Sequence, residues 1–226
     1  MQQYKTITFE DVENSFEFQT YIKKSNELLG VFGFTDHSAG HTKKVAHVAH
    51  EMLITMGYPA RDAELAKIAG YLHDMGNMVN RVDHAQTGAM MAFQLLTNMG
   101  MHPEELATVV SAIGNHDEKY GRAIDHISAA LIIADKTDVR RSRVRNQNKD
   151  TFDIHDRVNY AVEEANLKID ARKDHTIIRL ILKIDKKICP VMDYFEIFLD
   201  RMILCRHAAK FLNGEFQLNI NEAKLL

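Results

Sequence analysis

The sequence predicts a mostly helical protein, with a helical domain over residues 1–150 followed by a small α+β region over residues 151–226. Three observations support this fold class. Up to about residue 150, apolar side chains recur at the 3.6-residue period of helices. Ser, Thr, Asp and Pro stand where those helices begin, and Gly stands where they end. After residue 150, β-branched runs appear that are typical of strands. A chain of 226 residues, 46% of them hydrophobic, is long enough for one domain of ordinary size with a real core.

The first three expected helices cover residues 8–29, 40–57 and about 61–74. Thr8 and the acidic residues behind it suit a helix start, because they complement unbonded backbone N–H groups and the positive end of the helix dipole. The first helix spaces four apolar residues loosely along one side: Val12, Phe16, Ile22 and Leu29. The second matches the helical period more closely, with a stripe of His41, Val45, Val48, Ala49, Met52, Leu53 and Met56.

The next three helices are expected to begin after Asp83, at Pro103 and after Asp125. The first of these ends at Gly100, since glycine readily adopts the left-handed conformation that follows a helix. Pro103 suits a first helical position, where its missing N–H group is not needed, and two glutamates follow it.

Residues 151–226 are expected to combine strands with one helix. The stretch 140–150, RRSRVRNQNKD, is polar and basic and suits a helix end or a linker. Residues 166–185 predict two short strands joined by a turn around Lys173–Asp174. Pro190 should start an amphipathic helix that ends at Gly214, with an apolar stripe of Met192, Phe195, Leu199, Met202 and Ile203. Residues 215–220 alternate as an edge strand does, and a homodimer paired through that edge stays open.

The composition argues against several classes of protein. A net charge of −3 provides no basic field for nucleic acid or for an anionic membrane surface. No apolar stretch reaches the ~18–20 residues that span a bilayer, and the first ten residues lack the basic-then-apolar order of a signal peptide. Cys189 and Cys205 are the only cysteines, which argues against a disulfide framework. We therefore expect a cytoplasmic protein that binds neither nucleic acid nor membranes.

Twelve histidines are the unusual feature of the composition, and some of them lie on the apolar sides of expected helices. His41 stands at the head of its stripe, four residues before Val45, and His73 continues the stripe of its own helix. The same reasoning places six imidazole or carboxylate groups from five helices on the core side, near helix ends: His41, His73, Asp74, His84, His116 and Asp135. By contrast, His47 and His50 fall on the opposite face of their helix and are expected at the surface.

Burying these groups is costly unless something compensates. A buried unpaired carboxylate destabilises a protein strongly, and a neutral imidazole still needs hydrogen-bond partners. A bound cation would turn both kinds of group into ligands. Mixed nitrogen and oxygen ligands favour a divalent transition metal (manganese, iron, zinc, cobalt or nickel) over magnesium or calcium. We predict that His73 and Asp74 bind one metal ion from adjacent positions, while the number of ions, one or two, stays open.

Other polar residues near these positions have two explanations each. Cations next to His41 and after Asp135 suit phosphate binding, or equally a solvated helix end; they are Lys43, Lys44, Arg140, Arg141, Arg143 and Arg145. Asp138 can pair with an arginine or take part in catalysis, and Asn77 and Asn115 are candidate donors to ligands. The remaining histidines have no comparable placement: His37, His102, His126, His155, His175 and His207.

Five segments resemble, in order and spacing, the HD-domain metal-dependent phosphohydrolase superfamily. They are GHTKKVAHVAHEML, LAKIAGYLHDMGNMVN, HAQTGAMMAFQLL, LATVVSAIGNHDE and AALIIADKTDVRR, within residues 36–145. The His-Asp pair alone is a weak signal, but it is specific when it has a His-x-x-x-Val upstream and an Ala-Asp at the end of an apolar helix downstream. The detailed pattern is most similar to bacterial HD-type dinucleoside-polyphosphate hydrolases.

The resemblance implies an HD-type all-helical bundle and assigns roles to the six core-side groups. His41, His73, Asp74 and Asp135 correspond to its four-ligand metal site, and His84 and His116 to the extra histidines of branches with two metals. We expect hydrolysis of a small phosphomonoester or phosphoanhydride substrate, a nucleotide in the leading hypothesis, by metal-activated water. Asp74, His84 and His116 would be catalytic. Two alternatives stay open: a non-catalytic HD-like regulatory module that binds a ligand, and a diiron HD-type oxygenase.

Two features depart from particular branches of that superfamily. The segment HDMGNMVN lacks the two acids that follow the His-Asp pair in nucleotide-alarmone hydrolases. The Gly-Tyr-Pro signature of cyclic-dinucleotide phosphodiesterases is not found after the His-Asp pair; the one Gly-Tyr-Pro of the chain, residues 57–59, precedes that pair. Neither of those two activities is therefore expected.

Overall fold

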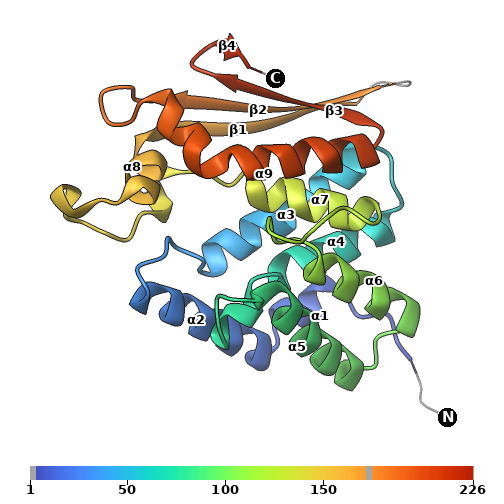
Figure 1. The fold of residues 1–226 in the computed structure, drawn as a ribbon. Helices are drawn as coiled ribbons and strands as arrows, with labels where there is room; N and C mark the ends of the chain where they lie inside the picture. The colour runs from blue at the N-terminus through green and yellow to red at the C-terminus, as the bar shows by residue number, and fades with distance from the viewer. Residues whose placement is uncertain (1–3, 172–174, 226) are drawn as a thin grey trace.

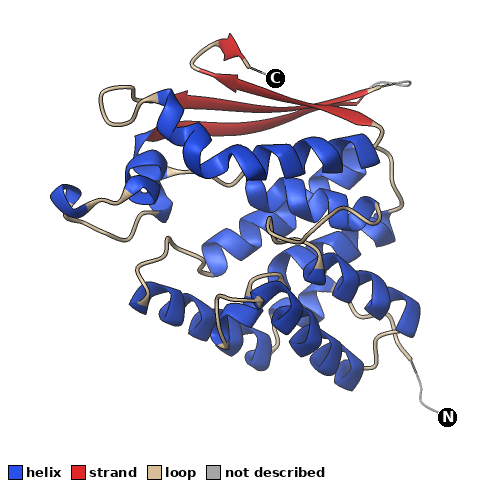
Figure 2. Cartoon of the chain, in the orientation of Figure 1, coloured by secondary structure: helices blue, strands red, loops and turns tan. Residues whose placement is uncertain are grey.

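The computed structural model describes residues 4–171 and 175–225, and it confirms the predicted fold class. Helices fill most of the chain up to residue 161, and a small sheet with one long helix follows (Figures 1 and 2). The α-helices described are α1 (Phe9–Glu13), α2 (Phe16–Val31), α3 (Ala39–Thr55), α4 (Ala60–Leu72), α5 (His84–Met99), α6 (Pro103–Gly114), α7 (His126–Lys136), α8 (Ile154–Ala161) and α9 (Val191–Phe211). The 3₁₀ segments are η1 (Met75–Met78), η2 (Arg141–Arg143) and η3 (Lys149–Thr151), and the strands are β1 (Val162–Ala171), β2 (Thr176–Ile184), β3 (Gly214–Ile220) and β4 (Ala223–Lys224).

Local chemistry explains why the central helices begin and end where predicted. The Ser38 hydroxyl accepts a hydrogen bond from the backbone N–H of Gly40 and so caps α3. Asp125 and Ser128 form a reciprocal capping box at the start of α7. Gly100 ends α5 in the left-handed region, at φ 88°. These caps lie within a few residues of the helices they stop or start, so the sequence alone reveals them.

The first predicted helix is wrong in one respect, because the structure breaks it into α1 and α2. Thr8 caps α1 together with Asp11, as its side chain predicts. The chain then leaves the helix at Asn14 and starts again after Ser15. The restart changes the phase of the apolar side chains, so Phe16 is 81% exposed instead of buried.

The C-terminal region requires three corrections. Helix α8 was not expected, although Ile154, Val158 and Ala161 follow the helical period and Asp153 caps the helix. Strand β1 begins at Val162, four residues before the expected start, whereas the expected turn at Lys173–Asp174 lies outside the described residues. Helix α9 buries Tyr194 and Phe198 and exposes Met192, since apolar residues occur on several of its faces and the aromatic one packs inward.

The C-terminal region forms a layer on top of the helical part (Figure 1). The strand order is β1-β2-β3-β4, with β2 and β3 parallel and the other neighbouring pairs antiparallel. Helix α9 packs against β3 on one side and against α7 on the other. The region after residue 150 therefore lies against α7, the helix that carries Asp135. A domain boundary at residue 150 stays a prediction.

Two glycines allow helices to approach closely beneath the site. A Cβ atom on Gly70 of α4 would lie 2.8 Å from the Ala46 Cα atom of α3. A Cβ atom on Gly76 would lie 2.0 Å from the carbonyl oxygen of His84, at the start of α5. Only glycine fits such contacts, so both positions help to bring the ends of α3, α4 and α5 together. None of the helices described is long and apolar enough to cross a membrane.

Candidate metal centre

The structure brings together all six side chains that the sequence analysis placed on the core side. Each stands at the end of a helix: His41 in the first turn of α3, His73 and Asp74 directly after α4, His84 at the start of α5, His116 just after α6, and Asp135 in the last turn of α7. The four histidines are at most 3% exposed, and the Asp135 side chain is 11% exposed. These six residues are called the core cluster below.

One half of the core cluster consists of two histidines and two carboxylates. The Nε2 atom of His41 lies 3.3 Å from Asp135 Oδ1 and 3.7 Å from Asp74 Oδ2. The Nε2 atom of His73 lies 3.5 Å and 3.3 Å from the same two oxygens. Four potential ligand atoms therefore face one small volume.

The orientation of these two rings is set by their other nitrogen. His73 Nδ1 is 2.8 Å from the carbonyl oxygen of Gly70, which can only accept, so Nδ1 carries the proton. His41 Nδ1 is 2.8 Å from Asp138 Oδ2. Both Nε2 atoms are buried without a hydrogen-bond partner among the described residues. Their lone pairs thus point at the shared volume, where a cation would take both.

The other half of the core cluster is built around the second oxygen of Asp74. Asp74 Oδ1 lies 3.5 Å from His84 Nε2 and 4.0 Å from His116 Nε2. The Nδ1 atoms of these histidines again face carbonyl oxygens, those of Arg81 and Ile113. Their Nε2 lone pairs therefore meet at 3.2 Å, an arrangement that requires a proton or a cation between or beside them.

The electrostatics of the core cluster favour a cation in its first half. Burial by itself lowers the pKa of His73, but the Asp74 and Asp135 carboxylates raise it to about 10. Burial lowers the pKa of His84 and lowers that of His116 well below the usual value. Despite burial, neighbouring cations and histidines keep the pKa values of both aspartates well below normal. The carboxylates therefore stay charged and attract positive charge at His73.

The donor set fits a divalent transition metal. Neutral imidazole nitrogens and carboxylate oxygens within 4.8 Å of one another occur in three overlapping groups, and all are drawn from the core cluster. Such mixed nitrogen and oxygen ligands are typical of manganese, iron, cobalt, nickel and zinc sites. Asp74 contributes one oxygen to each half, so the geometry accommodates one ion or two. Metal binding by these residues stays a prediction.

Further side chains support the core cluster from behind. Asn77 donates to Asp74 Oδ1 at 2.9 Å and so orients that carboxylate. Lys136 pairs with Asp135 Oδ2 at 2.7 Å, which leaves Oδ1 for the cluster. Asp138 accepts from His41 and also pairs with Lys44 at 2.7 Å. Asp138 thus contacts a candidate ligand and pairs with cations, Arg140 among them, as one of its two sequence interpretations expects. Asn115 donates to the carbonyl oxygen of Ser111 within its own helix turn.

Some residues near the core cluster were missed by sequence reasoning. His37 was given no role, yet its Nε2 atom lies 3.8 Å from Asp74 Oδ2. The only signal was nearness in sequence, because His37 lies in the loop before α3, four residues before His41. Arg81 Nη1 lies 3.3 Å from His84 Nε2, and Arg81 likewise stands in the loop before α5, three residues before His84. As predicted, His47 on the far face of α3 is exposed.

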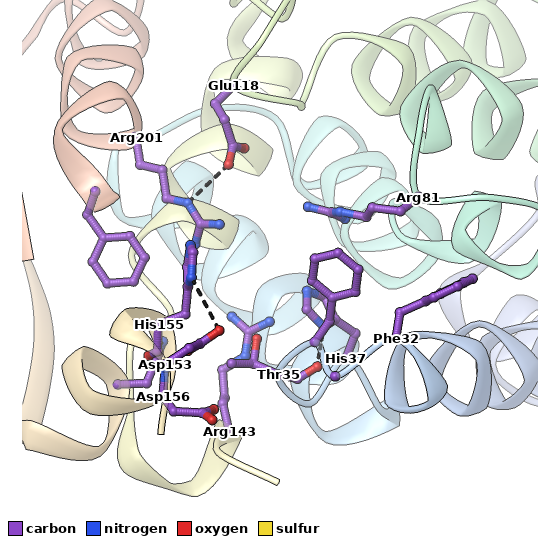
Figure 3. A pocket seen from close by; sticks show the side chains of 14 residues that line it. Phe32, Thr35, His37, Arg81, Glu118, Arg143, Asp153, His155, Asp156 and Arg201 are labelled. Atoms are coloured by element: carbon purple, nitrogen blue, oxygen red, sulfur yellow. Dashed lines mark hydrogen bonds and ion pairs between the residues drawn. The ribbon is translucent and has the colours of Figure 1, made fainter. Parts of the chain in front are cut away.

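The four arginines after α7 have different environments. Arg140 pairs with Asp138, Arg141 donates to the Tyr160 carbonyl oxygen, and Arg145 binds Asn26. Only Arg143 lines a cavity next to the core cluster, which it shares with His37, Arg81 and Arg201 (Figure 3). Of these, Arg201 comes from α9, far along the chain, and no local sequence signal points to it.

Comparison with known families concerns the part of the chain that holds the core cluster. Residues 38–140 match the family model of the HD domain. Over these residues the chain therefore matches an HD domain, as its five sequence segments predicted. The core cluster lies entirely within the matched residues.

Two known proteins are similar to this chain. A Methanocaldococcus jannaschii protein, MJ1020, is 27% identical over 186 residues, which cover 72% of this chain and 71% of the relative. A crystal structure named as that of a predicted HD superfamily hydrolase, from an uncultured Thermotogales bacterium, is 26% identical with a TM-score of 0.43. That similarity covers 55% of this chain and 67% of the other.

Proposed function

We propose that this protein is a metal-dependent phosphohydrolase that acts on a small phosphorylated substrate, and that this substrate is a nucleotide. The observation that carries the proposal is the pair of buried, unbonded Nε2 atoms of His41 and His73, which face the carboxylates of Asp74 and Asp135. Buried polar atoms without partners are rare in proteins, and here a cation would satisfy both of them.

The ligand assignment follows the two halves of the core cluster. His41, His73, Asp74 and Asp135 would hold the first divalent ion, which is manganese, iron, zinc, cobalt or nickel. His84 and His116 would hold a second ion together with Asp74 Oδ1, or contact the substrate phosphate directly. A bound divalent ion lowers the pKa of a coordinated water toward ~7 and polarises a phosphoryl oxygen.

The chain's own residues prepare the site for this chemistry. Backbone carbonyls and Asp138 fix the histidine rings, so that no reorientation is needed when substrate arrives. Arg81, whose Nη1 atom is 3.8 Å from Asp74 Oδ1, would donate to the phosphoryl oxygens. Asp74, His84 and His116 would be the catalytic residues, since Asp74 Oδ1 faces both imidazoles and lies 3.8 Å from Arg81 Nη1.

Elemental analysis combined with a phosphate-release screen tests the proposal. Protein purified without chelator should retain a transition metal and release phosphate from some members of a panel of mono-, di- and dinucleotides. His41→Ala and His73→Ala should lose metal and activity. His47→Ala is the matched control, because it lies on the exposed face of the same helix as His41 and should retain both.

The same experiment distinguishes the competing functions. A regulatory module would bind a ligand without releasing phosphate, even when metal is present. A diiron oxygenase would consume oxygen and contain an iron pair with an EPR signal. Full activity in His73→Ala would contradict the ligand assignment.

A further inference from the structure

A cavity of about 350 Å³ adjoins the core cluster and is bounded by both parts of the chain. On the side of the HD domain, His37 and Arg81 line it, and each lies 3.8 Å from an oxygen of Asp74. On the other side, α8 and α9 contribute residues from outside the HD domain. The volume is within the range of pockets that hold small-molecule ligands.

Three arginines from separate elements point into this cavity (Figure 3). Arg81 precedes α5, Arg143 belongs to η2, and Arg201 belongs to α9. Because arginine presents a planar set of N–H donors, it suits phosphate groups better than any other side chain. Their convergence indicates an anionic ligand.

The environment of Arg143 supports the same conclusion independently. Arg143 is only 4% exposed, and its Nε and Nη1 atoms donate to the uncharged carbonyl oxygens of Asp36 and Asp138. The one carboxylate within 4.0 Å of it among the described residues is Asp138, which also pairs with Lys44 and Arg140. Lys44 and Arg140 are partly exposed to water, whereas Arg143 is buried and shares the Asp138 carboxylate with them. A bound anion in the cavity would therefore add a favourable partner for the buried charge of Arg143.

Arg201 is held in place while part of its guanidinium stays available. Its Nε atom donates to Glu118 at 3.1 Å, and its guanidinium lies 4.9 Å from the centre of the Phe198 ring. Its two terminal nitrogens make no hydrogen bond with any residue that the structure describes. Lys136 also pairs with Glu118, at 2.7 Å, so Glu118 keeps a cation even without Arg201.

The wall formed by α8 has the opposite chemistry. Asp153, which caps α8, and Asp156 in its first turn line the cavity together with Asn159 (Figure 3 labels the two aspartates). His155 lines the same wall, and its Nδ1 atom lies 3.8 Å from Asp153 Oδ2. Carboxylate and amide oxygens accept hydrogen bonds from hydroxyl groups and repel phosphates. The cavity is therefore basic near the core cluster and acidic at its far end.

We propose that the cavity binds a substrate with two consecutive phosphoryl groups followed by a hydroxyl-bearing part, as in a nucleoside diphosphate. The terminal phosphoryl would lie at the core cluster beside Arg81, and the next one between Arg143 and Arg201. Sugar hydroxyls would face Asp153 and Asp156. This inference rests on the proposed hydrolase function and narrows its substrate to a phosphoanhydride.

The reaction is then the hydrolysis of a terminal anhydride bond. The oxygen of water bonds to the terminal phosphorus, and the bond from that phosphorus to the bridging oxygen breaks. The bridging oxygen keeps the electron pair and stays on the shorter phosphate ester. The water oxygen leaves in inorganic phosphate, and one proton is released.

The test compares Arg201→Gln, Arg201→Lys and the control Arg206→Gln, which lies on the exposed face of the same helix. Hydrolysis of ADP and of p-nitrophenyl phosphate, which has a single phosphoryl group, is measured for each variant. Loss of a charge-assisted hydrogen bond should raise the KM for ADP about tenfold or more in Arg201→Gln. The ratio of kcat/KM for ADP to that for p-nitrophenyl phosphate should fall by a similar factor. For Arg201→Lys this ratio should lie between the ratios of Arg201→Gln and the wild type. Arg206→Gln should leave the ratio unchanged.

Calorimetry with the non-hydrolysable methylene analogue of ADP tests the cavity without turnover. The protein as isolated should bind this analogue at least about tenfold more tightly than AMP, and Arg201→Gln should remove most of that difference. Equal affinity for the two ligands, or an unchanged difference in Arg201→Gln, would overturn the proposal. If the expected binding is found but no substrate releases phosphate, the proposed hydrolase function fails while the diphosphate site stands.

Discussion

Asp138 offers the most direct test of how the candidate metal centre is organised. Its carboxylate is 3% exposed and accepts from His41 Nδ1 at 2.8 Å, while Lys44 and Arg140 lie at 2.7 Å and 2.8 Å. The substitution Asp138→Asn preserves the shape of the side chain and removes its charge. It therefore affects both the orientation of His41 and the pairing of the two cations.

The structure sets the size of the two expected effects. Loss of a carboxylate behind a histidine ligand typically weakens metal binding about 10–100-fold. Breaking a buried ion pair costs about 3–5 kcal/mol. The side chains of Lys44 and Arg140 are 37% and 33% exposed, so water compensates part of that loss. We expect metal-free Asp138→Asn to lose about 2–4 kcal/mol of unfolding free energy relative to the metal-free wild type. This is less than the full cost of breaking a buried ion pair, because the two cations are partly solvated.

Metal titration by calorimetry and urea unfolding of the chelated protein measure the two effects separately. Asp62→Asn is the matched control, because Asp62 pairs with His126 at 2.7 Å at the opposite ends of α4 and α7. That variant should bind metal as the wild type does. Unchanged metal affinity in Asp138→Asn would refute the reasoning, since His41 would then hold its orientation without the carboxylate.

Three further predictions concern packing, pH and metal removal. Gly76→Ala should lower the unfolding free energy, measured by urea titration, by at least about 2 kcal/mol, because the new Cβ atom would meet the carbonyl oxygen of His84 at 2.0 Å. Gly114→Ala is the control and should change the unfolding free energy little, because the nearest atom to its Cβ would be at 3.6 Å. The hydrogen bond from Arg61 lowers the pKa of Glu105 below its ordinary value of 4.5. The pair therefore stabilises the fold above that pH, and its contribution disappears as the pH falls through the lowered pKa of the folded state. Urea unfolding between about pH 6 and pH 3 should show a smaller loss of stability for Glu105→Gln than for the wild type. Metal present at 100 times its Kd should add about 2.7 kcal/mol of stability, which thermal unfolding with and without chelator will reveal; an unchanged Tm would argue against a structural metal.

The helices of the HD domain were predictable because their signals are local. The capping residues of α3 and α7, and the glycine after α5, act within one turn of the positions they specify. Placement of His41 and His73 on buried faces follows from the helical period in the same way. That local logic failed at α1 and α2, where a cap in mid-segment restarted the helix and changed which side faces inward.

The cavity could not have been predicted by the same means. His37 lies in a loop and Arg143 in a short 3₁₀ segment, where periodicity gives no direction for a side chain. Arg201 lies on a helix with apolar residues on several faces, and the expected inward face was only partly right, because Met202 is buried whereas Met192 and Leu199 are exposed. Only the packing of α9 against α7 places Arg201 beside the HD domain.

By itself, the sequence determined the helical bundle and the identity of its six core-side ligand candidates, because caps, periods and polar residues on buried faces are short-range features. The tertiary structure decided which Nε2 atoms lack partners, how Asp74 divides its two oxygens, and which arginines surround the neighbouring cavity. Those features depend on distances between segments up to about 120 residues apart, for example Arg81 and Arg201. Such distances are set by the close packing of whole helices, which no local pattern encodes.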